Sequence, residues 1–360
     1  MLVRRARLWN LRSHRELEVG LGLGLNVLVG PNGAGKTTVL EALTLALDGD
    51  PLRPGNPRDL ISRDQEYLRV EIDLEDGATT TATTAYSRQG ERRLSADGAP
   101  LADTARWREA IPVRTFVPDD LRLVKGSPRR RREYLDALAS RCGPEYRGVL
   151  GRYEEALAQR NLLLRTTRGG GDDGQFGPWE TILAQTGLAV TDGRAAALSS
   201  FIESFQRTHA ELTGDPPDAL RLVYRTNVAG LDEAEYKMRL AETRTADRQR
   251  TYTHLGPHRD DLRLMRSGLD MRDCASQGEQ RTALLTLVLA EWEYLCGMAQ
   301  KPLLLLDDVM SELDETRRRA LVGFVRRGGQ VVISTTDLRY FAPEELVDAT
   351  VVELATGAGT

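Results

Sequence analysis

The residues best suited to chemistry lie in the stretch GPNGAGKT, which spans 30–37. It follows the apolar run LNVLV and opens a helical pattern, and this context favours a P-loop. Its glycines let backbone N–H groups face phosphates, and the helix N-terminus adds a dipole that favours an anion. Lys36 would hold the β- and γ-phosphates and Thr37 would ligate magnesium, so we expect ATP and Mg²⁺ as cofactors. The expected nucleotide contacts here are Gly30, Asn32, Gly33, Gly35, Lys36, Thr37 and Thr38.

A second candidate element is LLLLDD, which spans 303–308. A continuous apolar run is typical of a parallel strand covered on both faces, and ligands bind beyond the carboxyl ends of such strands. Asp307 is therefore expected to reach the magnesium ion through water. Asp308 is expected to orient or deprotonate the attacking water.

Two polar turns could also bind an anion or merely cap helices. Ser276 and Glu279 in ASQGEQRT form a capping-box pattern, and Gly278 between them leaves room for a phosphate. Ser311 and Asp314 in SELD could simply begin the next helix. One chain cannot easily bring the Ser276 helix to its own P-loop. Two facing chains can, and this arrangement predicts an ATP-dependent homodimer.

The elements that would position these residues form an interrupted α/β pattern. Strand-like segments and one helix at 36–47 fill the first 120 residues, and helical patterns cover 144–168, 198–212 and 232–247. A Gly-rich turn, RGGGDDGQFGP, separates the first two. The α/β pattern then resumes. We expect a discontinuous α/β P-loop ATPase head at 1–124 and 253–360, with an inserted, mainly helical arm at 125–252.

Composition limits the function classes. The chain has 360 residues, a formal net charge of −4, three cysteines and four histidines. No apolar run approaches the roughly 18 residues that a bilayer span requires. The few, scattered cysteines argue against a disulfide framework or zinc site. We therefore expect a cytoplasmic protein with no membrane partner.

The motifs and their order carry a resemblance. P-loop, helical insertion, SQGEQ, LLLLDD and SELD follow each other as in ABC-type and structural-maintenance-of-chromosomes ATPase heads. Together with LWNLRSHRELEV, FVPDDLRLVKGSPRRRREYLD and HLGPHRDDL, they make the chain resemble the RecF family. The resemblance implies an ATP-dependent dimer that recognises duplex DNA or single-strand/double-strand junctions at gaps. With RecR and RecO, it would promote RecA loading in place of the single-strand binding protein.

The same resemblance implies further nucleotide contacts. Arg12 and Ser13 would lie near the nucleotide in the same chain. Residues of the SQGEQ and SELD turns would contact the nucleotide of the partner chain. These are Ser276, Gly278, Gln280 and Asp314.

Three departures from a generic ABC head predict slow chemistry. Asp308 stands where a catalytic glutamate is usual, and Thr336 where a histidine is usual. The segment VPDDL has no glutamine, so Asp119 or Asp120 would take its place. We expect a weak, DNA-stimulated ATPase in which ATP acts as a timed clamp.

The DNA contacts are less determined. The run Arg129, Arg130, Arg131 and Arg132 could bind DNA phosphates without reading sequence, or could be a solvated or salt-bridged helix start. His258 and Asp260 in GPHRDD are candidate catalysts, but a structural turn is the simpler interpretation. Two other functions stay open: an ABC-transporter ATPase subunit and a small chromosome-organising DNA scaffold.

Overall fold

The computed structural model describes residues 2–49, 51–53, 55–101, 111–118, 121–167, 173–298 and 300–355. Two predicted features, Asp119 with Asp120 and residues 168–172 of the Gly-rich turn, lie outside these residues. The chain divides into two compact units. The first, here the head unit, comprises Met1–Asp120, Thr208–Asp215 and Arg281–Thr360. The second, here the arm unit, comprises Leu121–Arg207 and Pro216–Gln280.

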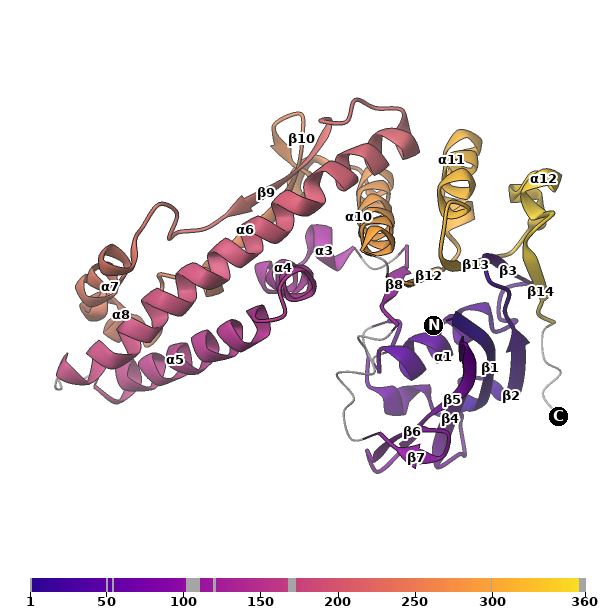
Figure 1. The fold of residues 1–360 in the computed structure, drawn as a ribbon, viewed down its shortest axis with the longest axis horizontal. Helices are drawn as coiled ribbons and strands as arrows, with labels where there is room; N and C mark the ends of the chain where they lie inside the picture. Colours follow the sequence, from indigo (N-terminus) through magenta and orange to yellow (C-terminus); the bar gives the residue numbers. More distant parts are fainter. Residues whose placement is uncertain are drawn as a thin grey trace. The chain divides into compact units, whose positions relative to one another are not determined.

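A five-stranded parallel sheet forms one layer of the head unit, in the order β14-β3-β13-β12-β8 (Figure 1). All four residues of β12 are buried, as its apolar sequence requires. The strands are β3 Leu25–Val29, β8 Val113–Phe116, β12 Leu303–Leu306, β13 Gln330–Thr335 and β14 Thr350–Glu353. Because the strands are parallel, the polar residues that follow β3, β12 and β13 emerge at one edge of the sheet.

A six-stranded antiparallel sheet forms another layer, in the order β2-β1-β4-β5-β6-β7. Its longest pairing joins β4 to β5, from Tyr67↔Ser87 to Asp76↔Ala78, around Gly77 with a φ of 81°. The strands are β1 Leu2–Leu11, β2 His14–Gly20, β4 Tyr67–Asp76, β5 Ala78–Ser87, β6 Arg92–Ala96 and β7 Ala99–Pro100.

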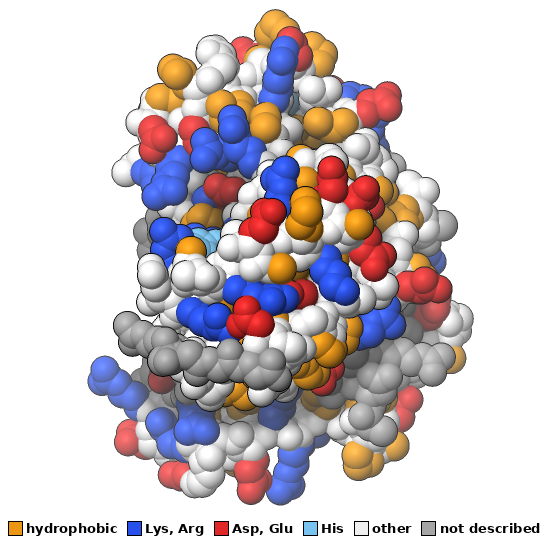
Figure 2. Space-filling view, turned by 90° about the vertical axis from the view of Figure 1, so that its left-hand side faces the viewer, with side chains coloured by type: hydrophobic (Ala, Val, Ile, Leu, Met, Phe, Trp, Pro, Cys, Tyr) orange, Lys and Arg blue, Asp and Glu red, His pale blue; other side chains and the backbone are white. Residues whose placement is uncertain are grey.

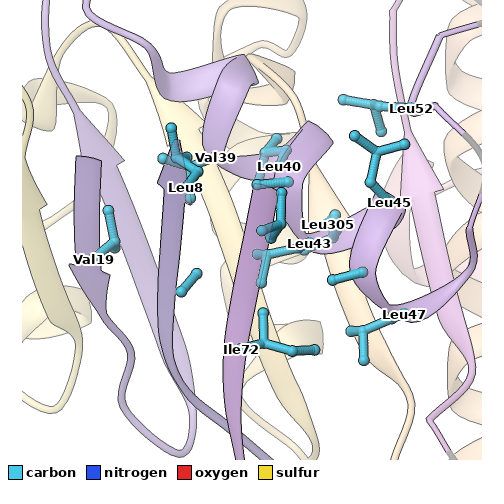
Figure 3. Close-up of a cluster of buried hydrophobic side chains, with 14 of the residues drawn as sticks. Leu8, Val19, Val39, Leu40, Leu43, Leu45, Leu47, Leu52, Ile72 and Leu305 are labelled. Atoms are coloured by element: carbon cyan, nitrogen blue, oxygen red, sulfur yellow. The ribbon is translucent and has the colours of Figure 1, made fainter. Parts of the chain in front are cut away.

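Helix α1, Lys36–Leu47, carries the core between these sheets. Eleven of its twelve residues are buried, which explains why its sequence is apolar around the whole helix. Its leucines meet side chains of β1 and β4 on one side and of β12 on the other (Figure 3). This packing fixes the helix whose first residue is the P-loop lysine. The head unit also contains α11 Glu315–Val325 and α12 Pro343–Leu346. Helix α10, Gln277–Gly297, has its first residues in the arm unit and the rest, from Arg281, in the head unit.

Two long helices, α5 Tyr146–Thr166 and α6 Gly177–Thr213, form the predicted antiparallel pair (Figure 1). Their register follows from three contacts. A Cβ at Gly193 would lie 2.7 Å from the Tyr146 ring, and one at Gly187 would lie 3.2 Å from Tyr153. Farther along, Arg160 pairs with Glu180. The glycines of α6 therefore admit the aromatic side chains of α5.

A three-stranded sheet, in the order β11-β10-β9, completes the arm unit with shorter helices. The 232–247 helix is broken: Thr243 ends α7 and precedes α8. The elements are α3 Arg122–Lys125, α4 Pro128–Cys142, β9 Leu220–Arg225, α7 Glu233–Glu242, α8 Arg244–Arg250, β10 Asp261–Arg266, β11 Leu269–Asp270 and α9 Met271–Cys274. The arm unit thus extends to Gln280, beyond the insertion boundary of 252 expected from the sequence. No helix within the described ranges has the length and apolarity needed to cross a membrane.

Candidate nucleotide site

Residues from separate parts of the head unit line one pocket of about 390 Å³. Ten of its twelve lining residues were predicted from the sequence, and Arg53 and Ser334 were not. The lining comprises Arg12, Ser13, Asn32, Gly33, Gly35, Lys36, Thr37, Thr38, Arg53, Asp307, Asp308 and Ser334. The pocket is large enough for a small ligand.

The P-loop has the backbone that its glycines permit. Gly33 and Gly35 have φ angles of 85° and 93°, in the left-handed region that disfavours other residues. A Cβ at Gly35 would also lie 2.2 Å from His14 Nε2. Gly30 does not line the pocket, but a Cβ there would lie 2.3 Å from the Leu354 carbonyl oxygen. Gly30 is therefore needed for packing of the loop.

Lys36 closes over the loop. Its Nζ donates to the Gly30 and Pro31 carbonyls, at 2.7 and 3.0 Å. Burial lowers the pKa of this ammonium group, and Asp307 and Asp308 act in the opposite direction. Its charge is thus balanced only by backbone dipoles and distant carboxylates, an arrangement that suits a cation awaiting an anion.

Asp307 gathers three side chains at the end of β12. The Thr37 hydroxyl lies 2.9 and 3.1 Å from its two carboxylate oxygens, and the Ser334 hydroxyl donates at 2.8 Å. Arg53 Nη2 lies 3.3 Å from Oδ2. A hydroxyl beside a carboxylate fits magnesium, which takes oxygen ligands and keeps several waters. Thr37 and Asp307 therefore fit the predicted metal role.

Asp308 is held in a strained conformation with one free oxygen. Its φ of 44° is left-handed, which costs about 1–3 kcal/mol for a residue other than glycine. Oδ2 lies 3.0 Å from the Ser311 hydroxyl, while the buried Oδ1 has no hydrogen-bond partner among the described residues. An unsatisfied buried acceptor beside a phosphate pocket is suited to bind a water.

Arg12 is fixed by the helix that also presents the P-loop. Its Nε and Nη2 donate to Glu41 of α1, at 2.7 and 2.8 Å, and Glu41 is 1% exposed. This pairing raises the pKa of Arg12. The φ of 58° at Arg12 makes the sharp turn that brings it and Ser13 to the pocket. A bidentate arginine is thereby preorganised for an anion.

The SQGEQ turn lies in the arm unit. Ser276 N donates to Glu279 at 2.8 Å, and Glu279 N donates to the Ser276 hydroxyl at 3.3 Å, so the capping box is formed. Gln280 is buried and donates to the Met271 and Ala275 carbonyls. A Cβ at Gly278 would meet nothing within 4 Å, so packing within the chain does not require a glycine there.

Asp314 and Thr336 lie in the head unit but do not line the pocket. Asp314 is the N-cap of α11, since its carboxylate accepts from Arg317 N at 2.9 Å. Thr336 follows β13 and is exposed. Asp314 thus has the capping role that was weighed as the alternative, and its exposure leaves it accessible to a partner chain.

The arginine run of α4 divides into two pairs. Arg131 is 4% exposed and makes two hydrogen bonds to Asp261, and Arg132 donates to the Asp260 carbonyl. Arg129 and Arg130 are exposed and share Glu133. Arg132 is half-buried, so the latter pair is the most exposed part of the run. On the face in Figure 2, coloured basic side chains stand in small groups among acidic and hydrophobic ones.

His258 and Asp260 serve the arm fold. The Tyr153 hydroxyl lies 2.6 Å from His258 Nδ1, and His258 Nε2 donates to the Thr253 carbonyl at 2.8 Å. Burial lowers the pKa of His258 to about 4. Asp260 is 1% exposed and accepts from Arg194 at 3.2 Å. Asp260 is buried, His258 is half-buried, and both are paired, so they have the geometry of a structural turn.

Three residues of the site were missed in the sequence. Ser334 ends a buried strand, where a polar residue at the carboxyl edge is a usable signal. Glu41 is an acid in an otherwise apolar helix, which signals a buried partner. Arg53 lies in an irregular loop, and no pattern marks it.

Relatives are found along nearly the whole chain. A family model described as an AAA domain matches residues 5–116. The DNA replication and repair protein RecF of Heliobacterium modesticaldum is 34% identical over 366 residues, which cover 99% of this chain and 98% of that protein. RecF of Symbiobacterium thermophilum is 36% identical over 338 residues, with coverages of 91% and 89%.

Solved structures extend the likeness to three dimensions. The recombination mediator protein RecF-ATP in the RecFOR pathway matches with a TM-score of 0.80 and 30% identity, covering 93% of this chain and 92% of that one. An Smc head bound to the C-winged helix domain of ScpA matches with a TM-score of 0.57 and 15% identity, covering 94% and 90%. These neighbours confirm the predicted fold class, an ABC-type ATPase head with an inserted helical arm.

Proposed function

Because this chain belongs to the RecF family of DNA replication and repair proteins, we propose that it is an ATP-dependent, dimerising recombination mediator. The observation that carries the proposal is the pocket of the head unit. It gathers Arg12, Lys36 and Thr37 with the paired acids Asp307 and Asp308, which are the parts that phosphate and magnesium binding require. A protein of this family has been solved with ATP.

Within the pocket, each group has a role that its contacts support. Lys36 and the P-loop N–H groups bind the β- and γ-phosphates, and Arg12 adds a preorganised cation. Thr37 and Asp307 hold Mg²⁺, which would supply neutralisation of the phosphate charge. Asp308 Oδ1, which has no protein partner, orients the attacking water.

Hydrolysis is slow in this proposal. Asp308 is shorter than the glutamate usual in ABC heads, and Thr336 cannot act as a general acid or base. We expect turnover below the roughly 1 s⁻¹ lower end of typical enzymes, with stimulation by DNA. A phosphate-release assay with and without duplex DNA tests this, and fast turnover without DNA would contradict it.

The dimer is the central test. Two chains face each other, so that the P-loop of one meets Ser276, Gly278, Gln280 and Asp314 of the other. Light scattering should show a monomer without nucleotide, a dimer with ATP and Mg²⁺, and no dimer for Ser276→Arg. A wild-type monomer under all conditions would remove the dimer from the proposal.

DNA binding follows from the family, and Arg129 and Arg130 are the candidate phosphate contacts. We propose duplex or gapped DNA as the ligand, with RecR and RecO as partners in RecA loading in the cytoplasm. Each phosphate contact contributes about 0.9 to the slope of log K against log salt, so Arg129→Ala/Arg130→Ala should reduce the slope by up to about 2. Arg319→Ala is the matched control, because Arg319 is also an exposed arginine in an i,i+4 pair. An unchanged slope in the double variant would exclude these arginines.

A further inference from the structure

Arg281 joins three segments of the head unit. It lies in the first turns of α10, five residues after Ser276. Its Nη1 contacts Glu312 Oε2 at 2.5 Å, and its Nε donates to the Pro118 carbonyl at 3.3 Å, just beyond β8. The two side chains of the ion pair are 26% and 28% exposed. Partial burial and two bonded nitrogens distinguish this pair from a solvated surface contact.

Glu312 continues this connection toward the catalytic acids. It ends a short 3₁₀ turn, Val309–Glu312, that follows directly on Asp308. The preceding residue, Ser311, places its hydroxyl 2.9 Å from the Asp308 carbonyl oxygen and 3.0 Å from Asp308 Oδ2. One short turn is therefore bonded to the catalytic carboxylate at one point and to α10 at another.

We propose that Arg281 is a positioning residue that couples the Ser276 end of α10 to Asp308 through Glu312 and Ser311. The coupling rests on the proposed dimer, in which the Ser276 end of the helix contacts the partner's nucleotide. When that contact orders the start of α10, the Arg281–Glu312 pair holds the turn in register, and Ser311 fixes the rotamer of Asp308. Nucleotide bound to the P-loop of one chain thereby fixes the orientation of Asp308 in the other chain.

The physical basis is a difference between two arrangements of the turn. Asp308 has a left-handed backbone, so its carboxylate depends on neighbouring contacts for its orientation. Coupling free energies between sites typically change an affinity or a population 5–150-fold, roughly. The two sites of the dimer should consequently hydrolyse ATP cooperatively.

A charge-exchange series tests the pair in the full-length protein. The variants are Arg281→Glu, Glu312→Arg and the double exchange. Binding of a fluorescent ATP analogue with Mg²⁺ to dilute monomer should stay within about two-fold, because neither residue lines the pocket. In each single variant, the Hill coefficient of hydrolysis should fall to about 1 and kcat should fall roughly ten-fold. The double exchange should restore both.

The Arg319–Glu315 pair supplies the control, since it is an exposed ion pair within α11 and joins neither the Val309–Glu312 turn nor the start of α10. Its exchange should change nothing. Glu312→Gln provides a milder variant if a charge reversal prevents folding, which circular dichroism will show. Single variants with wild-type cooperativity and kcat, or a double exchange that fails to restore them, would overturn the coupling. Wild-type protein that stays monomeric with ATP would instead overturn the proposed function on which the coupling rests.

Discussion

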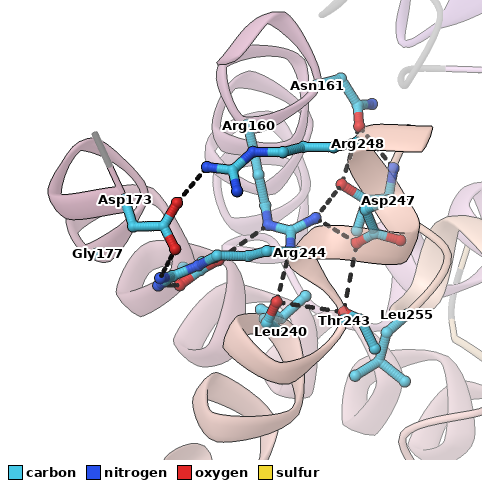
Figure 4. Close-up of polar contacts among 12 residues, drawn as sticks. Arg160, Asn161, Asp173, Gly177, Leu240, Thr243, Arg244, Asp247, Arg248 and Leu255 are labelled. Carbon is cyan, nitrogen blue, oxygen red and sulfur yellow. Dashed lines mark hydrogen bonds and ion pairs between the residues drawn. The ribbon is translucent and has the colours of Figure 1, made fainter. Parts of the chain in front are cut away.

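The nucleotide pocket and the arm both contain clusters of charged side chains, but the two clusters differ in how completely the charges are paired. In the arm, Arg160 contacts Glu180, Asp247, Thr253 Oγ1 and the Leu240 carbonyl, at 3.2, 2.7, 2.8 and 2.7 Å (Figure 4). The three ionised side chains are fully buried.

The pocket leaves its charges incompletely satisfied. Within the part of the chain that the structure describes, Asp308 Oδ1 has no hydrogen-bond partner. Lys36 donates to backbone carbonyls, and Arg53 is 48% exposed where it meets Asp307. Contacts of this kind can be exchanged for a ligand, whereas those of Arg160 can only be lost. The comparison teaches that charge density alone does not identify a functional site, and that contacts exchangeable for a ligand are the better indication.

The largest expected effect is from Arg160→Met in the arm. The substitution leaves Asp247 buried without its arginine, while Glu180 keeps Arg244, so the free energy of unfolding should fall by about 3–5 kcal/mol. Urea denaturation followed by circular dichroism measures this. Arg319→Ala, which breaks an exposed pair, should cost less than about 1 kcal/mol. Equal small effects in both variants would show that the arm cluster is as exchangeable as a surface pair.

The second prediction concerns the pH dependence of the stability of the arm unit. His258 lies half-buried between Tyr153 and Thr253, and desolvation lowers its pKa to about 4 from an ordinary value near 6.5. Arg259, Arg132 and Arg160 also disfavour its cation. Between these pH values the unfolded state binds more protons, so stability from His258 is present above pH 6.5 and is lost as pH falls toward 4.

The expected loss is about 2 kcal/mol between pH 7 and pH 5. His258→Gln, which cannot titrate, should flatten the pH dependence of the unfolding midpoint in this range. His14→Gln is the comparison, because burial also lowers the pKa of His14, which lies in the head unit. A His258→Gln profile that matches wild type would show that folding does not lower the pKa of His258.

The third prediction turns to the pocket. Lys36→Met removes a charge-assisted contact to phosphate worth about 1.5–3 kcal/mol, so ATP affinity should fall on the order of 10–100-fold. Without nucleotide, however, stability should change by less than about 1 kcal/mol, because removal of a partly desolvated ammonium offsets its lost carbonyl contacts. Isothermal titration calorimetry measures the ATP affinity, and urea denaturation measures the stability without nucleotide. A large loss of stability without ATP would make Lys36 a structural residue like Arg160.

The pocket was predicted from the sequence much better than the charged cluster of the arm. The helix at 36–47 and the strand at LLLLDD were predicted closely, because a P-loop and a buried apolar strand are local signals. Most pocket residues belong to these segments, so they were predicted with them.

The arm cluster was not predicted, since the contacts of Arg160 come from positions 180, 240, 247 and 253. Nothing in a linear pattern pairs residues at such separations. Arg131 illustrates the same limit: the run RRRR predicts either a DNA phosphate contact or a solvated or salt-bridged helix start, but only the fold shows that its partner is Asp261, 130 residues away. Side-chain pairing between distant segments needs the fold.

The smallest expected effect is for Arg53, whose charge is paired like those of the arm but half exposed at the pocket. Its guanidinium lies beside Asp307, on the carboxylate assigned to Mg²⁺, so the cation must compete with it. Because the pair is half exposed, its contribution is at most about 1 kcal/mol, and Arg53→Ala should lower the Mg²⁺ concentration for half-saturated ATP binding by up to about five-fold. Arg63→Ala, an exposed arginine farther along the chain, should leave the titration unchanged. If half-saturation instead requires more Mg²⁺, Arg53 binds the nucleotide directly, and its contact with Asp307 is a resting position from which the ligand displaces it.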